Sequence, residues 1–240
     1  METKTEKNLK AIILAAGRGT RLYPITLNKP KGLLEVGDET ILDRLVRQFK
    51  SSGIKDILIV VGYQKEHLIN HFGDSVRYSY YEDFSKTNNL HTLWSVRNEL
   101  NDDVIITFAD LVVHQDIINL LVKSKKDISM AIDTSQVLKS TMRVAIKNNY
   151  IKNITTTTVA EADGNFIGIS KISQSGCALL LNEMSKIVDS HHQDYYTIAV
   201  DNIARKGNKV GYCDVKKYIW REIDTKDEYN ELINIYNKFS

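Results

Sequence analysis

The sequence contains few cysteines and no long apolar run, and both absences limit what the chain can be. Its two cysteines, Cys177 and Cys213, lie far apart in unlike contexts. A zinc site would need paired Cys or His ligands at short spacing, which His191 and His192 alone do not supply. We therefore expect two buried free thiols in a reducing cytoplasm. No stretch approaches the roughly 20 apolar residues of a membrane span. Residues 1–8 lack the apolar core of a signal peptide, so we expect a cytoplasmic protein without a membrane partner.

A strong excess of charge of one sign is also absent, because 32 basic and 30 acidic residues give a formal net charge of +2. The densest basic runs, residues 123–126 and 216–217, are short and are best interpreted as solvated faces. A nucleic-acid-binding protein usually carries a basic stripe, so we expect no nucleic-acid partner. Proline is scarce as well, with only Pro24 and Pro30, and the chain has no Pro/Gly-rich linker or internal repeat. One domain with two halves is the economical interpretation.

Apolar runs alternate with helical periodicity through the first half of the chain. The clearest buried strands are predicted at residues 10–15, 56–61 and 104–108, with helices between them. This alternation favours a mostly parallel sheet covered on both sides. From about residue 143, short strand-like pieces separated by polar turns predict an antiparallel lobe. The predicted fold is therefore α/β: a Rossmann-like, mostly parallel mixed sheet flanked by helices, with a smaller antiparallel lobe, in one domain (1–240) whose halves are about 9–135 and 136–240.

The most informative segment follows the first predicted strand and carries Gly17, Gly19, Arg21 and Lys31. Small residues and glycines let backbone N–H groups approach a triphosphate, while an arginine fork and a lysine ammonium bind its oxygens. A dinucleotide-binding motif would need a third glycine where Leu22 stands, and a Walker motif is absent. An ordinary glycine-rich turn remains the alternative. The spacing of the two cations favours a triphosphate loop.

This segment resembles the signature of the nucleotidyltransferase superfamily of sugar-phosphate and related enzymes: an apolar strand, L-A-A-G-x-G-[TS]-R, and P-K some eight residues later. The resemblance implies that Arg21 contacts the β- and γ-phosphates and that Lys31 contacts the α-phosphate. It further implies that the loop and three later positions surround the nucleotide. The nucleotide-binding residues so expected are Leu14, Ala15, Ala16, Gly17, Gly19, Thr20, Gly62, Asn88 and Ala109.

Two separated aspartates stand where phosphoryl chemistry would need a divalent cation. Asp110 follows the buried strand at residues 104–108, and Asp224 precedes the last predicted helix. Each aspartate could instead cap the helix that follows it. For Asp224 this alternative is strong, because either Asp224 or Thr225 would be a good N-cap for the last predicted helix. In the superfamily, one metal-binding Asp follows a buried strand and a second lies in a W-x-[ED]-[IVL]-[DN]-T segment. The resemblance therefore implies that Asp110 and Asp224 bind Mg²⁺, with Glu222 assisting the metal or the acceptor.

Within the superfamily the chain looks closest to short cytidylyltransferases that activate phosphocholine, aminoethylphosphonate or similar head groups. The resemblance rests on segments 61–63, 81–84, 87–94, 108–113 and 220–225. Asn88 offers a donor and acceptor pair for cytosine or ribose, or else simply caps a helix. Aromatic and acidic residues would suit an ammonium head group, whereas an arginine near them would suit an acceptor with an extra carboxylate or phosphate. The acceptor-binding residues so expected are Tyr81, Glu82, Arg143, Asp194, Tyr195, Trp220 and Glu222.

The resemblance implies a Mg²⁺-dependent transfer of CMP from CTP to a small phosphorylated or phosphonate acceptor, with release of pyrophosphate. Arg21, Lys31, Asp110 and Asp224 would form the catalytic set, and catalysis would consist of positioning and charge neutralisation. Two alternatives stay open. One is a sugar-1-phosphate nucleotidyltransferase that uses UTP, dTTP or GTP. The other is a non-catalytic nucleotide-binding regulatory subunit. The sequence also leaves a homodimer open.

Overall fold

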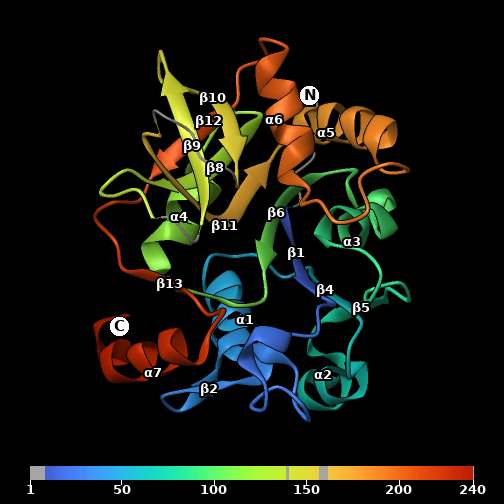
Figure 1. Ribbon diagram of the computed structural model, residues 1–240, viewed down its shortest axis with the longest axis vertical. Helices are drawn as coiled ribbons and strands as arrows, with labels where there is room; N and C mark the ends of the chain where they lie inside the picture. Colours follow the sequence, from blue (N-terminus) through green and yellow to red (C-terminus); the bar gives the residue numbers. More distant parts are fainter. Residues whose placement is uncertain (1–8, 139–140, 157–161, 240) are drawn as a thin grey trace, which may run out of the picture.

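The computed structural model describes residues 9–138, 141–156 and 162–239. Its central feature is a mixed sheet, and the N-terminal half of that sheet is parallel (Figure 1). In the parallel half, β1 lies between two other strands that run in the same direction, and a fourth strand extends the edge. Continuous apolar runs form these strands because both of their faces are covered. The order is β6 (Asp103–Phe108), β1 (Leu9–Ala15), β4 (Ile57–Val61) and β5 (Arg77–Tyr80).

The other half of the sheet is largely antiparallel and begins at β11 (Gly164–Ile172), which pairs with β6. β11 also pairs antiparallel with β8 (Ile128–Asp133) and with β9 (Met142–Lys147). β10 (Tyr150–Thr155) continues from β9, and β12 (Gly211–Asp214) joins β8 in parallel. The predicted fold class, a Rossmann-like mixed sheet with an antiparallel lobe, is therefore confirmed.

Helices cover both faces of this sheet, as the alternation along β1 requires. Ala11 and Ile13 face one apolar core, which also contains residues of α1 (Ile41–Ser51), α2 (Lys65–Phe72) and α4 (Gln115–Lys123). Ile12 and Leu14 face the opposite core. That second core contains residues of α3 (Asn89–Ser95), α5 (Gln174–Ile187) and α6 (Thr197–Arg205). Successive strand residues point to opposite faces, so both cores extend to the carboxyl end of β1.

Two small sheets lie beside the main one. β2 (Glu35–Val36) and β3 (Glu39–Thr40) form a hairpin ahead of α1. β7 (Leu111–Val113) directly follows β6 and pairs antiparallel with β13 (Trp220–Glu222), a pairing that the sequence analysis did not predict. The chain then continues into α7 (Lys226–Ile235) and the 3-10 helix η5 (Tyr236–Phe239), which lie at the α1 end of the molecule (Figure 1).

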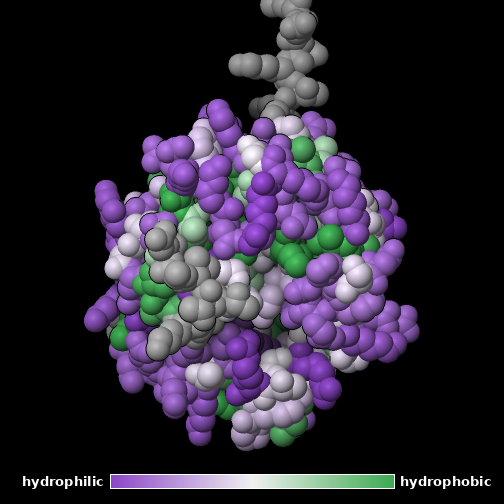
Figure 2. Space-filling view, turned by 45° about the horizontal axis from the view of Figure 1, so that its top comes forward, coloured by the Kyte–Doolittle hydropathy of each residue, from purple (hydrophilic) through white to green (hydrophobic). Residues whose placement is uncertain are grey.

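Two sequence expectations concern the cysteines and the membrane. Both cysteines are free thiols, and Cys177 is buried, but Cys213 is only partly buried because it lies on the edge strand β12. No helix in the described part of the chain is long and apolar enough to span a bilayer. Residues 1–8 lie outside the described residues. On the face in Figure 2, hydrophobic residues gather only in small groups.

Candidate active site

A cleft of about 270 Å³ lies where the parallel strands β1 and β6 end. In open α/β sheets, the crevice at the carboxyl ends of the strands is the usual ligand site. The first half of the chain supplies most of the wall, and Tyr195, Glu222 and Asp224 close it from the second half. Predicted nucleotide-binding residues that line the cleft are Leu14, Ala15, Ala16, Gly17, Gly19, Thr20, Asn88 and Ala109.

The glycines of the loop after β1 differ in what they do. Gly19 has a left-handed backbone (φ 61°), which lets the loop turn into the short helix η1 (Thr20–Leu22). Its carbonyl accepts a hydrogen bond from Thr26 Oγ1 at 2.8 Å, which closes the loop. Gly17 has no atom within 4 Å of the place where a Cβ would stand. The loop therefore presents bare backbone at Gly17, a place where a phosphate or ribose can approach closely.

Four charged side chains from distant parts of the sequence meet at one wall of the cleft. Lys31 Nζ donates to Asp110 Oδ2 and to Asp224 Oδ1, each at 2.7 Å. Arg21 Nη2 lies 2.7 Å from the same Asp224 Oδ1. The side chains of Lys31, Asp110 and Asp224 are 13%, 19% and 17% exposed, whereas Arg21 is 64% exposed. The four residues expected to be catalytic therefore form one connected cluster, with Arg21 at its open side.

Backbone contacts hold the two aspartates side by side. Ile223 N donates to Asp110 O at 3.0 Å, directly beyond the pairing of β7 with β13. Thr225, not Asp224, caps α7, and His114, not Asp110, caps α4. The capping alternatives for Asp110 and Asp224 are therefore excluded, and both carboxylates are left to the cleft.

The neighbouring charges alter the pKa values of Lys31 and Glu222. Burial would lower the pKa of the Lys31 ammonium, but Asp110 and Asp224 outweigh burial and raise it above its usual 10.5. Burial, reinforced by repulsion from Asp110 and Asp224, raises the pKa of Glu222 to about 8. Without a further cation, the site therefore keeps Lys31 charged and a proton on Glu222 near neutral pH.

The surroundings of Asp110 and Asp224 bear on whether they can bind the divalent cation that the resemblance implies. Asp110 Oδ1 is buried and has no hydrogen-bond partner among the described residues. Asp110 and Asp224 already share one cation, the Lys31 ammonium. The described residues contain no group of three or more His, Cys, Asp or Glu side chains arranged around a metal position. Two carboxylates without a full protein cage fit Mg²⁺, which keeps waters and takes phosphate oxygens as its other ligands.

A smaller cavity of about 80 Å³ opens beside the cluster. It shares Arg21, Tyr195, Glu222 and Asp224 with the main cleft, so a molecule in it would lie against the same charges. Burial raises the pKa of the Tyr195 phenol, which keeps it protonated as a hydrogen-bond donor. The remaining wall is mostly apolar and comes from the antiparallel lobe and β6: Phe108, Thr141, Met142, Thr156 and Phe166.

The other predicted site residues lie in more varied places. Gly62 supports the cleft from behind, because a Cβ there would meet Ala16 O at 2.6 Å. Asn88 lines the cleft and also caps α3 by accepting from Asn89 N at 2.8 Å. Tyr81 donates to or accepts from Thr87 Oγ1 at 2.6 Å, and Glu82 is exposed.

Five of the seven predicted acceptor residues do not line the two cavities around the cluster: Tyr81, Glu82, Arg143, Asp194 and Trp220. Asp194 lies in an adjoining hollow and contacts His191 Nδ1 at 2.7 Å. Trp220 lines a third cavity, of about 390 Å³, which shares Glu222 and Asp224 with the main cleft, and its indole N–H donates to Asp133 Oδ2. Arg143 lines none of these cavities among the described residues, because its strand neighbour Met142 points into the small cavity and alternate residues face opposite sides. Arg143 therefore does not share the small cavity with Tyr195 and Glu222, and its role toward an acceptor stays a prediction.

Several cleft residues were not singled out from the sequence. They surround the part of the cleft next to Asn88, on the loop before α3, on α3 itself and at the end of β6. Polar residues in a segment that opens a helix after a strand were the available signal for some of them. The residues are Phe84, Thr87, Asn89, Thr92 and Phe108.

Comparison with known proteins identifies the family of the chain. Residues 10–159 match the family described as Nucleotidyl transferase. The CTP:phosphoglutamine cytidylyltransferase of Campylobacter jejuni is 30% identical over 185 residues, which cover 69% of this chain and 73% of that protein. The choline-phosphate cytidylyltransferase of Streptococcus pneumoniae is 41% identical over 101 residues, which cover 41% of this chain and 43% of that protein.

Two further similarities mark the breadth of the family. The UTP–glucose-1-phosphate uridylyltransferase AglF of Haloferax volcanii is 31% identical over 122 residues, which cover half of each chain. The solved structure of the CTP:phosphocholine cytidylyltransferase of Streptococcus pneumoniae superposes with a TM-score of 0.77 at 24% identity, covering 95% of this chain and 99% of that one. The chain belongs to the nucleotidyl transferase family.

Proposed function

We propose that this member of the nucleotidyl transferase family transfers CMP from CTP to a small phosphorylated or phosphonate acceptor and releases pyrophosphate, with Mg²⁺ as cofactor. The observation that carries the proposal is the cluster in which Lys31 bridges Asp110 and Asp224 while Arg21 holds Asp224 from the open side. It lies in the same cleft as the bare backbone at Gly17. Two cations and two carboxylates at a phosphate-sized loop are what triphosphate chemistry requires.

In this mechanism an anionic acceptor oxygen attacks the α-phosphorus in line with the departing pyrophosphate. The bond between the α-phosphorus and the bridging oxygen breaks, and pyrophosphate leaves with the electron pair. Mg²⁺ bound by Asp110 and Asp224 would neutralise charge on the triphosphate oxygens. Lys31 and Arg21 then turn from the carboxylates to phosphate oxygens, and the acceptor needs no general base because its oxygen is already ionised. Glu222 and Tyr195 face the small cavity where the acceptor would lie.

The choice of CTP rests on relatives and not on a base contact. The names of two relatives specify CTP or cytidylyl transfer, and one of them aligns with more than two thirds of this chain. A small acceptor is supported by the volume of the second cavity, about 80 Å³. The combination of apolar walls, Tyr195 and Glu222 suits a compact head group of phosphocholine or aminoethylphosphonate type. In this scheme residues about 9–135 hold the nucleotide, and residues about 136–240 complete the acceptor site.

The test is a matrix of substrates. The purified chain is incubated with Mg²⁺, one of CTP, UTP, dTTP or GTP, and one of phosphocholine, phosphoglutamine, aminoethylphosphonate or glucose 1-phosphate, and pyrophosphate is measured. We expect release that needs both CTP and a small-head-group acceptor and that stops when EDTA removes the metal. The Asp110→Ala variant serves as the negative control. Release with UTP and glucose 1-phosphate but not with CTP would replace the proposal by its main alternative.

That alternative, a sugar-1-phosphate nucleotidyltransferase using UTP, dTTP or GTP, is favoured by one observation: a uridylyltransferase aligns with half of this chain at 31% identity. A non-catalytic regulatory subunit is less well supported. Such a protein has no need to keep Arg21, Lys31, Asp110 and Asp224 in mutual contact. No pyrophosphate from any pair in the matrix would favour it.

A further inference from the structure

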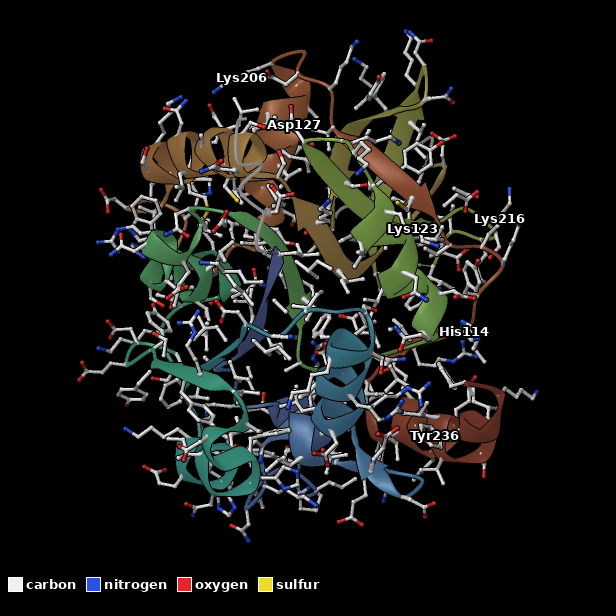
Figure 3. All side chains as sticks on the ribbon, turned by 180° about the vertical axis from the view of Figure 1, so that it is seen from behind. His114, Lys123, Asp127, Lys206, Lys216 and Tyr236 are labelled. Carbon is white, nitrogen blue, oxygen red and sulfur yellow. The ribbon has the colours of Figure 1, made fainter. Side chains whose placement is uncertain are left out.

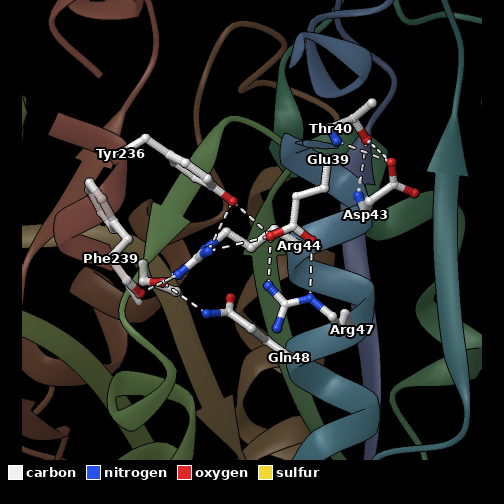
Figure 4. Close-up of polar contacts among 9 residues, drawn as sticks. Glu39, Thr40, Asp43, Arg44, Arg47, Gln48, Tyr236 and Phe239 are labelled. Carbon is white, nitrogen blue, oxygen red and sulfur yellow. Dashed lines mark hydrogen bonds and ion pairs between the residues drawn. The ribbon is translucent and has the colours of Figure 1, made fainter. Parts of the chain in front are cut away.

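Arg44 is a buried arginine outside the active site that the proposed reaction does not use. It lies on α1 and is only 6% exposed. Its guanidinium donates to Phe239 O, to Tyr236 Oη at 3.0 Å and to Val113 O at 3.4 Å (Figure 4). The group also lies over two aromatic rings, 5.2 Å from the centroid of Tyr236 and 5.8 Å from that of Phe239. A buried charge is tolerated only when it is fully bonded, so these contacts define one arrangement of the segments that meet there.

Three of the four acceptors of Arg44 come from segments that lead to the two aspartates, and the fourth is the Glu39 carboxylate. Val113 ends β7, which starts directly after Asp110. Tyr236 and Phe239 lie in η5, at the far end of the segment that begins with Asp224. Gln48, one turn after Arg44, also donates to Val113 O, at 2.9 Å. Figure 3 shows Tyr236 next to α1 at the end of α7, seen from behind. Helix α1 therefore contacts both segments of the chain that carry the carboxylates, the one after Asp110 and the one after Asp224.

A small apolar core lies between Arg44 and the active site. Phe239, 1% exposed, packs in a cluster with Leu22, Val112 and Ile223. Each of these three is one or two residues from Arg21, Asp110 or Asp224. Close-packed side chains transmit a displacement to their neighbours, so a shift of Phe239 would reach the catalytic side chains. At the other end of α7, Glu228 Oε2 accepts from Asp224 N at 2.8 Å.

We infer that Arg44 is a positioning residue for the proposed nucleotidyl transfer: by binding η5 and β7 to α1, it sets Asp224 at the distance from Asp110 that lets both share one cation. The inference rests on the proposed function. It adds a residue that touches neither nucleotide nor acceptor. Glu39 completes the arrangement, because its carboxylate accepts from Tyr236 Oη at 2.7 Å and from Arg44 Nη1 at 3.4 Å.

Arg47 offers a matched control on the same helix. It lies one turn after Arg44 and binds the same Glu39, at 2.6 Å, but its side chain is 55% exposed. Replacing either arginine by methionine removes one positive charge near Glu39. Only Arg44→Met removes the hydrogen bonds from α1 to η5, while β7 keeps its bond from Gln48. Arg44→Lys is the conservative variant, because a lysine keeps the charge but replaces the planar five-donor guanidinium by a compact ammonium that cannot stack on the two rings.

The experiment compares wild type, Arg44→Met, Arg44→Lys and Arg47→Met in two assays. Hydrogen exchange of the amides in residues 222–239 reports the segment itself, and we expect exchange at least about tenfold faster in Arg44→Met only. Pyrophosphate release reports how a change in this segment affects the reaction rate. We expect kcat to fall about tenfold or more in Arg44→Met, and the Mg²⁺ concentration at half-maximal rate to rise about fivefold. KM for the nucleotide should stay within about threefold, Arg44→Lys should be intermediate, and Arg47→Met should match wild type.

Two outcomes would overturn the inference. One is unchanged exchange in residues 222–239 of Arg44→Met. The other is faster exchange with unchanged kcat and Mg²⁺ dependence, which would make Arg44 a purely structural residue. If Arg44→Met does not fold, Tyr236→Phe takes its place, because it removes the hydroxyl between Arg44 and Glu39 without changing the volume. The rate is measured with whichever substrates the wild type uses, so failure of the proposed function changes the wild-type baseline and leaves the exchange result intact.

Discussion

Replacing Lys31 by methionine removes the cation that joins the two aspartates, and the structure sets the size of the effect. The ammonium contacts one oxygen of each carboxylate at 2.7 Å, and all three side chains are less than a fifth exposed. Removing one partner of a buried ion pair costs about 3–5 kcal/mol. Because Arg21 still holds Asp224, we take the lower end, about 3 kcal/mol. For a chain of this size that lowers Tm by about 6–12 °C.

Mg²⁺ should then affect the variant and the wild type differently. In the wild type a divalent ion has to displace the ammonium, so Mg²⁺ alone should raise Tm by less than about 2 °C. In Lys31→Met the carboxylates are free, and Mg²⁺ at a hundred times its Kd returns about 2.7 kcal/mol, or about 5–11 °C. The assay is thermal unfolding with and without Mg²⁺, in the absence of nucleotide.

Lys29→Met is the control for this experiment. Lys29 lies on the same loop but pairs with the exposed Glu35, so its loss should cost less than about 1 kcal/mol and create no response to Mg²⁺. An unchanged Tm of Lys31→Met without metal would refute the reasoning. Equal Mg²⁺ shifts in wild type and variant would also refute it, because the ammonium and the metal would then not share a place.

Four further predictions follow from single residues. Asp110→Ala should fold but lose about a thousandfold or more of the Mg²⁺-dependent pyrophosphate release, whereas Asp116→Asn on α4 should keep it; retained release in Asp110→Ala would remove the metal assignment. Gly17→Ala should change the free energy of unfolding by less than about 1 kcal/mol, since its Cβ meets nothing, yet raise KM for the nucleotide about tenfold. Gly32→Ala, whose Cβ would stand 2.5 Å from Leu42 Cδ1, should instead destabilise the fold by about 1–3 kcal/mol in urea unfolding. Hydrogen bonds from Arg77 lower the pKa of Glu99 from 4.5 to about 2; partial burial opposes this shift and Lys10 adds to it. The ionised Glu99 carboxylate therefore stabilises the fold fully above pH 4.5, and this stabilisation is lost as pH falls toward 2. Glu99→Gln should therefore lower the unfolding free energy at pH 7 by about 1–2 kcal/mol after solvent screening and flatten its acid dependence; an unchanged acid slope would contradict this.

The parallel half of the fold could be predicted from the sequence because strands that are buried on both faces consist of continuous apolar runs. The runs that became β1, β4 and β6 are of this kind, and the predicted bounds differ from the observed ones by a residue or so. β7 was missed because its three residues, Leu111–Val113, carry no periodicity and continue a strand that had just ended. Its identity as a strand comes only from pairing with β13, more than a hundred residues later.

Most residues that the sequence assigns to the nucleotide line one cleft, whereas most of those that it assigns to the acceptor do not line the cavities beside the cluster. The loop residues form a continuous motif, so their position in the sequence fixes their position in the cleft. On the acceptor side, the adjacent β9 residues Met142 and Arg143 point to opposite faces, and it is Met142 that lines the small cavity. A shift of one residue in register reverses every side chain of a strand, and no local pattern decides it. The contact between Arg44 and Phe239 joins residues 195 positions apart, and no local sequence pattern at either residue predicts it.

A crystal grown with CTP and Mn²⁺ tests the central claim most directly, because anomalous scattering locates the metal without reference to activity. The account predicts one strong peak within about 2.2 Å of carboxylate oxygens of both Asp110 and Asp224, with Lys31 moved onto a phosphate oxygen. A peak that contacts neither aspartate, or a bound triphosphate beside which Lys31 still bridges both carboxylates, would contradict it.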